Sequence, residues 1–265
     1  MIGHPMNEAS FRFDSHAVSH QGVVRTLNED RYYTEPRAGV WVVADGMGGH
    51  DAGEVASGAI VDQMATIGIP SSATDQHARF VDRLTRANDE LQRYSMARNG
   101  STVGSTVVAL LTFEDQYRCL WMGDARVYLI RRGQLKQLSR DHSEAQELID
   151  QGRLTVEEAR SYPRRNVITR AVGVSPEIQV DAVYGTIENG DSYLLCSDGL
   201  TAHCTDEDIL NAVAGRKPRE ACEILLDMTL ERGGTDNVTV VIVQARRTDT
   251  TIPVGEHSVK IEVGA

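Results

Sequence analysis

The sequence predicts an α+β fold in which strands and helices pack as a layered sandwich. Strand-like hydrophobic runs occur in antiparallel-looking groups, and helical patterns occur in pairs between these groups. A fold built from alternating β-α-β units would instead show one helix after each strand. The chain has 265 residues, of which 41% are hydrophobic, so it can bury a substantial core.

Hydrophobic periodicity predicts the elements of the first half of the chain. Alternating apolar residues indicate a half-exposed strand, short continuous apolar runs indicate buried strands, and apolar residues three or four positions apart indicate a helix. The expected elements are strands at 11–19 and 40–44, helices at 51–67 and 80–94, strands at 106–113 and 117–122, and a hairpin of 126–131 with 134–138. Gly133 lies between the two hairpin strands, as expected of a turn residue.

The second half begins with a polar, charged segment at 141–165, in which we expect two short helices. Thr155 and Glu158 in this segment have the spacing of a capping box. The elements expected after it are strands at 178–184 and 193–196, helices that begin near Thr205 and Arg219, and a strand at 238–243. The hydrophobic pattern then fades. We therefore interpret residues 1–245 as a single domain and residues 246–265 as a C-terminal tail.

The charge and the hydrophobic pattern limit the classes of function. The formal net charge is -11, which argues against nucleic acid as the main partner because phosphate backbones attract basic surfaces. The same charge fits an acidic cation site, although solubility alone explains most acidic proteins. No apolar run approaches the ~18 residues of a membrane span, and residues 1–10 do not resemble a signal peptide. We therefore expect a soluble cytoplasmic protein without membrane partners.

The cysteines indicate neither a zinc site nor disulfide bonds. They are Cys119, Cys196, Cys204 and Cys222. No two of them have Cys-x-x-Cys spacing, and no histidine cluster accompanies them. We expect buried free thiols, as is usual in a reducing cytosol.

Acidic residues lie at the ends of several predicted strands. Two hydrophobic runs break at an Asp-Gly dipeptide, so each strand is expected to deliver a carboxylate at its end and then turn on glycine. These dipeptides and the other acids of the pattern are Asp45-Gly46, Asp198-Gly199, Asp236 and Glu29-Asp30. Because Mg²⁺ and Mn²⁺ prefer rigidly held oxygen ligands, the pattern predicts a site for hard divalent cations. Taken singly, each acid could equally be an ordinary turn residue.

The motifs that carry these acids resemble those of the metal-dependent protein phosphatase (PPM) family, in its bacterial type 2C serine/threonine form. The matching stretches are Arg25-Thr26-Leu27-Asn28-Glu29-Asp30; Val43-Ala44-Asp45-Gly46-Met47-Gly48-Gly49-His50 with Gly53-Glu54 and Ala56-Ser57; Gly104-Ser105-Thr106; Gly123-Asp124-Ala125-Arg126; Ser197-Asp198-Gly199-Leu200; and Gly234-Thr235-Asp236-Asn237-Val238-Thr239. They occur in family order and cover nearly the whole chain. One Asp-Gly pair is weak evidence, whereas six ordered motifs are specific.

The resemblance implies a four-layer α-β-β-α sandwich with two central, mainly antiparallel sheets and a two-metal site at one end. It implies a Mn²⁺- or Mg²⁺-dependent phosphatase, in which a metal-bridged water or hydroxide attacks the phosphorus of phosphoserine or phosphothreonine on proteins. A bacterial serine/threonine kinase or its substrates would be partners, and a monomer is the default. Two hypotheses stay open beside it: a catalytically silent phosphatase-fold protein that binds or senses a partner, and a phosphatase of a small phosphorylated metabolite.

The resemblance also implies a set of core metal ligands that combines acidic side chains with one backbone carbonyl. Asp45 bridges both ions in this scheme, and several contacts run through water. The ligands of the first ion are Asp45, Asp198 and Asp236, and those of the second are Asp45, Glu29, Asp30 and the Gly46 carbonyl.

Two further positions match functional residues of the family. Arg25 corresponds to the phosphate-binding arginine, whose planar guanidinium suits bidentate contact with phosphate. Asp124 corresponds to the acid that helps Asp198 to hold a third, weaker metal in bacterial members. Ala125 stands where the family usually has serine, and Asp124 could instead cap a turn.

The resemblance leaves two alternatives for the proton donor to the leaving group. Eukaryotic relatives have a histidine directly after the first Asp-Gly, where this chain has Met47. His50 is a candidate general acid in its place, or it caps the helix that starts near residue 51 and a metal-bound water is the acid. The segment 141–165 lies where the family carries its flap subdomain, although it could be an ordinary surface excursion.

Overall fold

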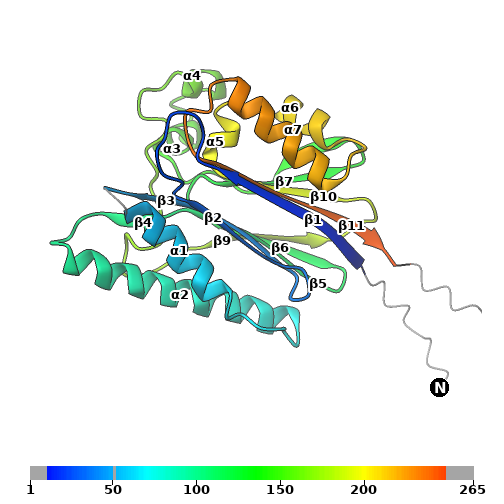
Figure 1. Cartoon of the computed structure of the whole chain (residues 1–265), viewed down its shortest axis with the longest axis horizontal. Coiled ribbons are helices and arrows are strands. Elements are labelled where there is room, and N and C mark those ends of the chain that lie inside the picture. Colours follow the sequence, from blue (N-terminus) through cyan, green and yellow to red (C-terminus); the bar gives the residue numbers. More distant parts are fainter. Residues whose placement is uncertain (1–10, 50–51, 249–265) are drawn as a thin grey trace, which may run out of the picture.

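Two antiparallel β-sheets stack face to face at the centre of the structure, a computed structural model that describes residues 11–49 and 52–248 (Figure 1). The first sheet has the order β1 (Phe11–His20), β11 (Val238–Arg247), β10 (Ser192–Cys196), β7 (Arg126–Arg131) and β8 (Gln134–Gln137). The second has the order β2 (Asp30–Glu35), β3 (Val40–Gly48), β5 (Val107–Phe113), β6 (Gln116–Met122) and β9 (Asp181–Thr186). A short strand, β4 (Val103–Ser105), pairs with the end of β3.

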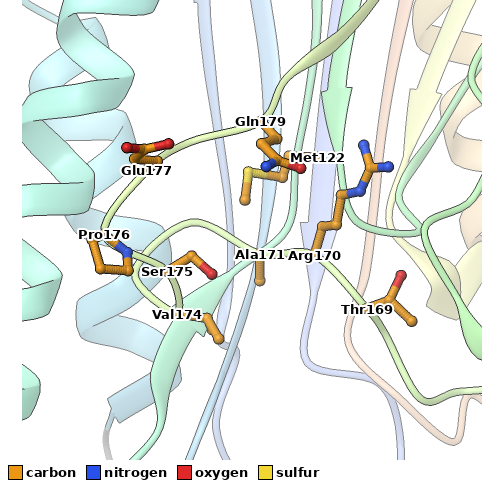
Figure 2. A pocket seen from close by; sticks show the side chains of 9 residues that line it. All are labelled: Met122, Thr169, Arg170, Ala171, Val174, Ser175, Pro176, Glu177 and Gln179. Atoms are coloured by element: carbon orange, nitrogen blue, oxygen red, sulfur yellow. The ribbon is translucent and has the colours of Figure 1, made fainter.

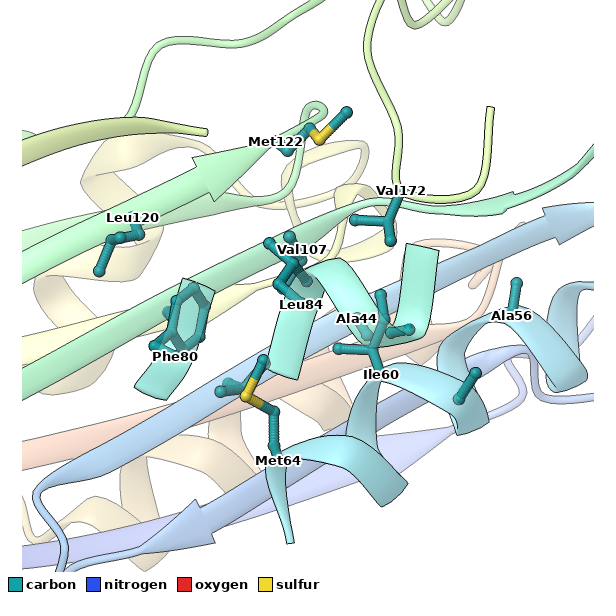
Figure 3. Packing of buried hydrophobic residues seen from close by; sticks show 14 of the residues in the cluster. Ala44, Ala56, Ile60, Met64, Phe80, Leu84, Val107, Leu120, Met122 and Val172 are labelled. Atoms are coloured by element: carbon teal, nitrogen blue, oxygen red, sulfur yellow. The ribbon is translucent and has the colours of Figure 1, made fainter. Parts of the chain in front are cut away.

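Helices cover the outer face of each sheet, which confirms the four-layer prediction (Figure 1). The second sheet is covered by α1 (Ala52–Met64) and α2 (Ala73–Ala97), and the first by α5 (Asp198–Thr201), α6 (Asp206–Val213) and α7 (Pro218–Glu231). Their apolar positions recur at helical spacing, so each helix buries one face. Figure 3 shows Ile60 and Met64 of α1 packed with Phe80 and Leu84 of α2 beneath the second sheet. No helix in the described ranges is long and apolar enough to cross a bilayer.

The core between the sheets is built from side chains that alternate along the inner strands. Trp41, Leu110, Tyr193 and Val241 all lie in this layer, each with almost no exposed surface. All four cysteines are buried free thiols in the part of the chain that the structure describes, which confirms that prediction. The packing of this layer fixes how the two sheets lie on each other, and therefore where the residues at the ends of their strands lie.

Hydrophobic periodicity fails to predict the short or polar strands correctly. Residues 30–35 form β2, which periodicity does not predict because it is a polar edge strand with one partner, β3. The strand expected at 178–184 is displaced to β9. The reason is that Ile178 and Val180 pack on the helix-covered core from a loop, so their hydrophobicity reports burial rather than a strand.

The segment 141–165 contains the two short helices that were expected, α3 (Glu144–Asp150) and α4 (Val156–Arg160). Thr155 and Glu158 form the predicted capping box, with the Thr155 amide donating to a Glu158 carboxylate oxygen at 2.8 Å. Glu144 ties the segment together, since it accepts from the Tyr162 hydroxyl at 2.6 Å and pairs with Arg164 at 2.8 Å. At the end of the chain β11 runs to Arg247, and residues 249–265 of the predicted tail lie outside the described residues.

Candidate active site

Strands of both sheets bring acidic side chains together at one end of the sandwich. Asp30 begins β2 and lies opposite Asp45 of β3 in the strand register. From the other sheet, Asp198 begins α5 shortly after β10, and Asp236 lies just before β11. Asp124 lies in the turn between β6 and β7. The charges of the other four aspartates all act on Asp45, so the five residues form one group. We call this group the acidic cluster; its members are Asp30, Asp45, Asp124, Asp198 and Asp236.

Burial and mutual repulsion raise the pKa values of four aspartates of the acidic cluster. Burial raises the pKa of Asp45 well above its ordinary value, and the charges of Asp30 and Asp198 raise it further. Burial likewise raises the pKa of Asp30 to about 7, that of Asp124 to about 8 and that of Asp198 to about 6. Carboxylates that repel one another in this way are stabilised by bound cations or by protons.

These shifts predict that the metal-free protein loses stability as the pH rises. The folded-state pKa values of the cluster lie above the unfolded value of about 3.9, so between these values the folded state binds more protons. The unfolding free energy should therefore fall by a few kcal/mol between pH 4 and about pH 8. Urea unfolding in the presence of a chelator at both pH values measures this. Asp30→Asn should reduce the fall, whereas a rising free energy would contradict the assignment.

One oxygen of Asp30 lacks a partner, although the residue is buried. Its Oδ2 accepts a hydrogen bond from the Ser197 hydroxyl at 2.6 Å, and that hydroxyl oxygen accepts from the Thr239 amide at 3.0 Å. Its Oδ1 has no hydrogen-bond partner among the described residues. Because buried polar atoms are normally satisfied, this oxygen marks a position where a cation or a water molecule fits.

The expected turn at Asp45-Gly46 is wrong, because β3 continues to Gly48 and pairs there with β4. Glycine is needed at position 46 for space rather than for a turn. A Cβ atom there would lie 2.0 Å from the Gly53 carbonyl oxygen and 2.7 Å from that of Glu29. The first turn of α1 can therefore approach β3 closely beside the acidic cluster.

The second Asp-Gly dipeptide follows a strand that ends as predicted, but it opens a helix. Asp198 is the first residue of α5, and Ser197 occupies the N-cap position. A Cβ atom on Gly199 would lie 1.9 Å from the Asn237 carbonyl oxygen. Glycine here lets α5 pack directly on the chain that leads into β11, which brings Asp198 close to the last motif.

Asn237 holds Glu29 in place, a role that the sequence reasoning missed. The Glu29 amide donates to the Asn237 side-chain oxygen at 2.8 Å, while the Asn237 side-chain nitrogen donates to the carbonyls of Gln21 and Leu27. At its other end Glu29 accepts from the Gly53 amide at 3.1 Å, and burial raises the pKa of its carboxyl. The sequence signal that could have indicated this role is the position of Asn237 directly after Asp236.

Arg25 lies at the exposed edge of the acidic cluster. Its guanidinium donates to Asp236 at 2.8 Å, and its side chain is 52% exposed. This hydrogen bond raises the pKa of Arg25, to which the charges of Glu29 and Asp198 also contribute. Such a cation can contact a bound anion from the solvent side while it remains paired with Asp236.

His142, to which the sequence reasoning assigned no role, holds the turn that carries Asp124. Its amide donates to the Gly123 carbonyl at 2.8 Å, and the Gly123 amide donates to His142 Nδ1 at 3.2 Å. The ring stacks on Trp121 and its Nε2 lies 3.1 Å from Asp181. His50, the candidate general acid, lies outside the described residues.

A separate hollow of about 420 Å³ lies beside the strand that leads to Asp124 (Figure 2). Its lining includes Met122 at the end of β6, together with Arg170 and Glu177. Arg170 already pairs with Asp181 at 3.1 Å. None of the acidic cluster lines this hollow, so the hollow and the acidic cluster are separate features.

The donors of the acidic cluster fit hard divalent cations in type. All are oxygens, one of them is unsatisfied, and their charged forms are destabilised by repulsion. Within the described ranges, no three His, Cys, Asp or Glu side chains converge tightly enough to enclose a metal directly.

A model of the family "Protein phosphatase 2C" matches residues 19–230 of this chain. The chain belongs to the protein phosphatase 2C family. The match runs from the end of β1 to near the end of α7 and includes the motifs from Arg25 to Leu200, and it confirms the family that the sequence motifs indicate.

Relatives in this family are named as phosphatases. The serine/threonine protein phosphatase PstP of Mycobacterium tuberculosis is 38% identical over 227 residues, which are 85% of this chain and 44% of PstP. The chain thus spans less than half of that relative. The serine/threonine phosphatase stp of Listeria monocytogenes is 32% identical over 247 residues, which are 89% of this chain and 95% of the relative.

A solved structure supports the fold of this protein phosphatase 2C member. The catalytic domain of PstP, in complex with two manganese ions, matches with a TM-score of 0.82 and 34% identity. The match covers 89% of this chain and all of that domain. The α+β sandwich fold is therefore that of the family.

Proposed function

We propose that this chain is a metal-dependent serine/threonine protein phosphatase, which hydrolyses phosphoserine and phosphothreonine on proteins. The observation that carries the proposal is the acidic cluster, which unites the family motifs at one end of the sandwich. A phosphomonoester dianion is hydrolysed very slowly without catalysis, and a cluster of repelling carboxylates is a suitable place to bind the cations that change this.

The metal ligands that we propose are those of the family pattern. They are Asp45, Asp198 and Asp236 for one ion, and Asp45, Glu29, Asp30 and the Gly46 carbonyl for the other. When bound, two Mn²⁺ or Mg²⁺ ions would activate a water molecule and neutralise phosphoryl charge. Ser197 and Asn237 would keep Asp30 and Glu29 in position through their hydrogen bonds.

The proposed site also includes Asp124. We propose that Asp124, together with Asp198, holds a third and weaker ion, since their charges interact and burial raises both pKa values.

We further propose one catalytic domain over residues 1–245, with residues 141–165 as its flap and 246–265 as its tail. His142 joins this segment to the Asp124 turn, which supports a flap that lies beside the site.

Arg25 is proposed to bind the substrate phosphate. Arg25→Ala should lower kcat/KM for a phosphothreonine peptide roughly 10- to 100-fold, mainly through KM, because a charged hydrogen bond contributes about 1.5–3 kcal/mol. Arg25→Lys should restore little, since lysine lacks the planar fork. Metal content, measured by elemental analysis, should stay unchanged. Arg219→Ala on the surface of α7 is the matched control, and an unchanged kcat/KM in Arg25→Ala would remove Arg25 from the site.

Substrate class is tested by comparing phosphoproteins with small molecules. The protein with Mn²⁺ should hydrolyse phosphoserine and phosphothreonine peptides in preference to small phosphorylated metabolites. A preference for metabolites would favour the metabolite phosphatase, and no hydrolysis of either would favour a silent binding protein. Every acid of the proposed two-metal core is present in the chain, which argues against the silent protein. A kinase partner, a monomeric state and a cytoplasmic location stay predictions.

A further inference from the structure

The loop between β1 and β2 carries Arg25 together with exposed apolar side chains. We call residues 21–28 the Arg25 loop. Val23 is 61% exposed, Val24 is 64% exposed and Leu27 is 42% exposed. Single exposed apolar residues are common on protein surfaces, but here they flank the proposed phosphate-binding residue on both sides.

The backbone of the Arg25 loop is fixed at several points. The Val23 amide donates to the Gly234 carbonyl at 2.9 Å. The Asn237 side chain donates to the carbonyls of Gln21 at 2.9 Å and Leu27 at 2.8 Å. The apolar side chains therefore project from a backbone that is tied to the last motif, and the loop cannot fold over to bury them without breaking these bonds.

Arg25 faces the acidic cluster from this loop. Its guanidinium pairs with Asp236 at 2.8 Å, and the charges of Glu29 and Asp198 act on it. Gly22 has a φ of +79°, and a Cβ atom there would lie 2.3 Å from the Asp236 carbonyl oxygen. The Arg25 loop thus packs directly on the backbone of Asp236, one of the aspartates of the acidic cluster.

We propose that Val23, Val24 and Leu27 form an apolar docking surface for the substrate polypeptide next to its phosphorylated residue. The proposal rests on the proposed function. Neighbouring Cα atoms are about 3.8 Å apart, and an extended chain advances about 3.3–3.6 Å per residue. A polypeptide whose phosphoryl group contacts Arg25 therefore places its adjacent residues within reach of the side chains adjacent to Arg25. The substrates should carry an apolar side chain one or two positions from the phosphoresidue.

The fixed backbone makes this surface suitable for binding. A preorganised loop loses little conformational freedom when the substrate binds, so the burial of apolar surface appears as affinity. Each valine or leucine side chain that becomes buried against an apolar substrate residue should contribute about 3- to 10-fold in kcat/KM.

The test compares two phosphothreonine peptides that are identical except for leucine or serine at the two positions on each side of the phosphoresidue. The wild-type protein with Mn²⁺ should prefer the leucine peptide by about 10-fold or more in kcat/KM. The double variant Val24→Ser/Leu27→Ser should reduce this ratio to about 1. The conservative double variant Val24→Ile/Leu27→Ile should keep the preference.

Ile69→Ser is the matched control for the removal of exposed apolar surface. Ile69 is 58% exposed and lies beside Phe11 at the start of β1, whereas the Arg25 loop follows the end of that strand. The control should leave the peptide ratio unchanged. Thermal unfolding of each variant shows whether it is folded.

Equal kcat/KM for the two peptides in the wild-type protein would overturn the docking surface and leave the proposed function intact. Hydrolysis of small metabolites but of neither peptide would contradict the proposed function, and the docking surface with it. One combination of results would assign the surface to self-association and overturn substrate docking. In that case sedimentation shows a dimer that Val24→Ser/Leu27→Ser abolishes, while the wild-type ratio of kcat/KM for the two peptides is near 1.

Discussion

Asp198→Asn is expected to lower kcat for a phosphothreonine peptide by at least about 10²-fold, because it weakens metal activation of the attacking water. The amide has nearly the shape of the carboxylate but carries no charge, so it holds a divalent cation less tightly. Asp198 lies where α5 meets the last motif, and its charge acts on Asp45 and Arg25. Steady-state kinetics at saturating Mn²⁺ measure the effect.

The same substitution should have the opposite effect on the stability of the metal-free protein. Burial, together with the charge of Asp236, raises the pKa of the Asp198 carboxyl to about 6. Asparagine removes the buried charge and its repulsion at neutral pH. A variant that unfolds at higher urea concentration but turns over slowly is therefore expected. Asp62→Asn on the exposed face of α1 is the control and should change neither quantity. A kcat within twofold of wild type would remove Asp198 from the proposed site.

Periodicity predicts the buried elements of this fold well, since burial imposes the repeat. The core strands β3, β5, β6 and β10 and the amphipathic α2 all follow from apolar patterns. The edge strand β2 is polar, and β4 has three residues, so neither carries a pattern of its own. Both form because β3 offers them hydrogen-bonding partners, which is tertiary information.

The acidic cluster could be predicted residue by residue because its members lie within motifs. The hydrogen bonds that hold these acids in place could not be predicted, because they join distant parts of the chain. Ser197 reaches Asp30 from the other sheet, and Asn237 reaches the Glu29 amide across the end of the sandwich. Glycine at position 46 was expected to form a turn, whereas the structure requires it for the close approach of α1.

The acidic cluster is expected to bind divalent cations, and phosphate hydrolysis is expected to depend on this binding. The most direct measurement is a Mn²⁺ titration of chelator-treated protein, with binding followed by calorimetry and turnover of a phosphothreonine peptide measured on the same samples. We expect a background rate without metal, restored activity as two ions bind, and a melting temperature that rises with metal concentration. Full activity after exhaustive chelation would contradict this expectation.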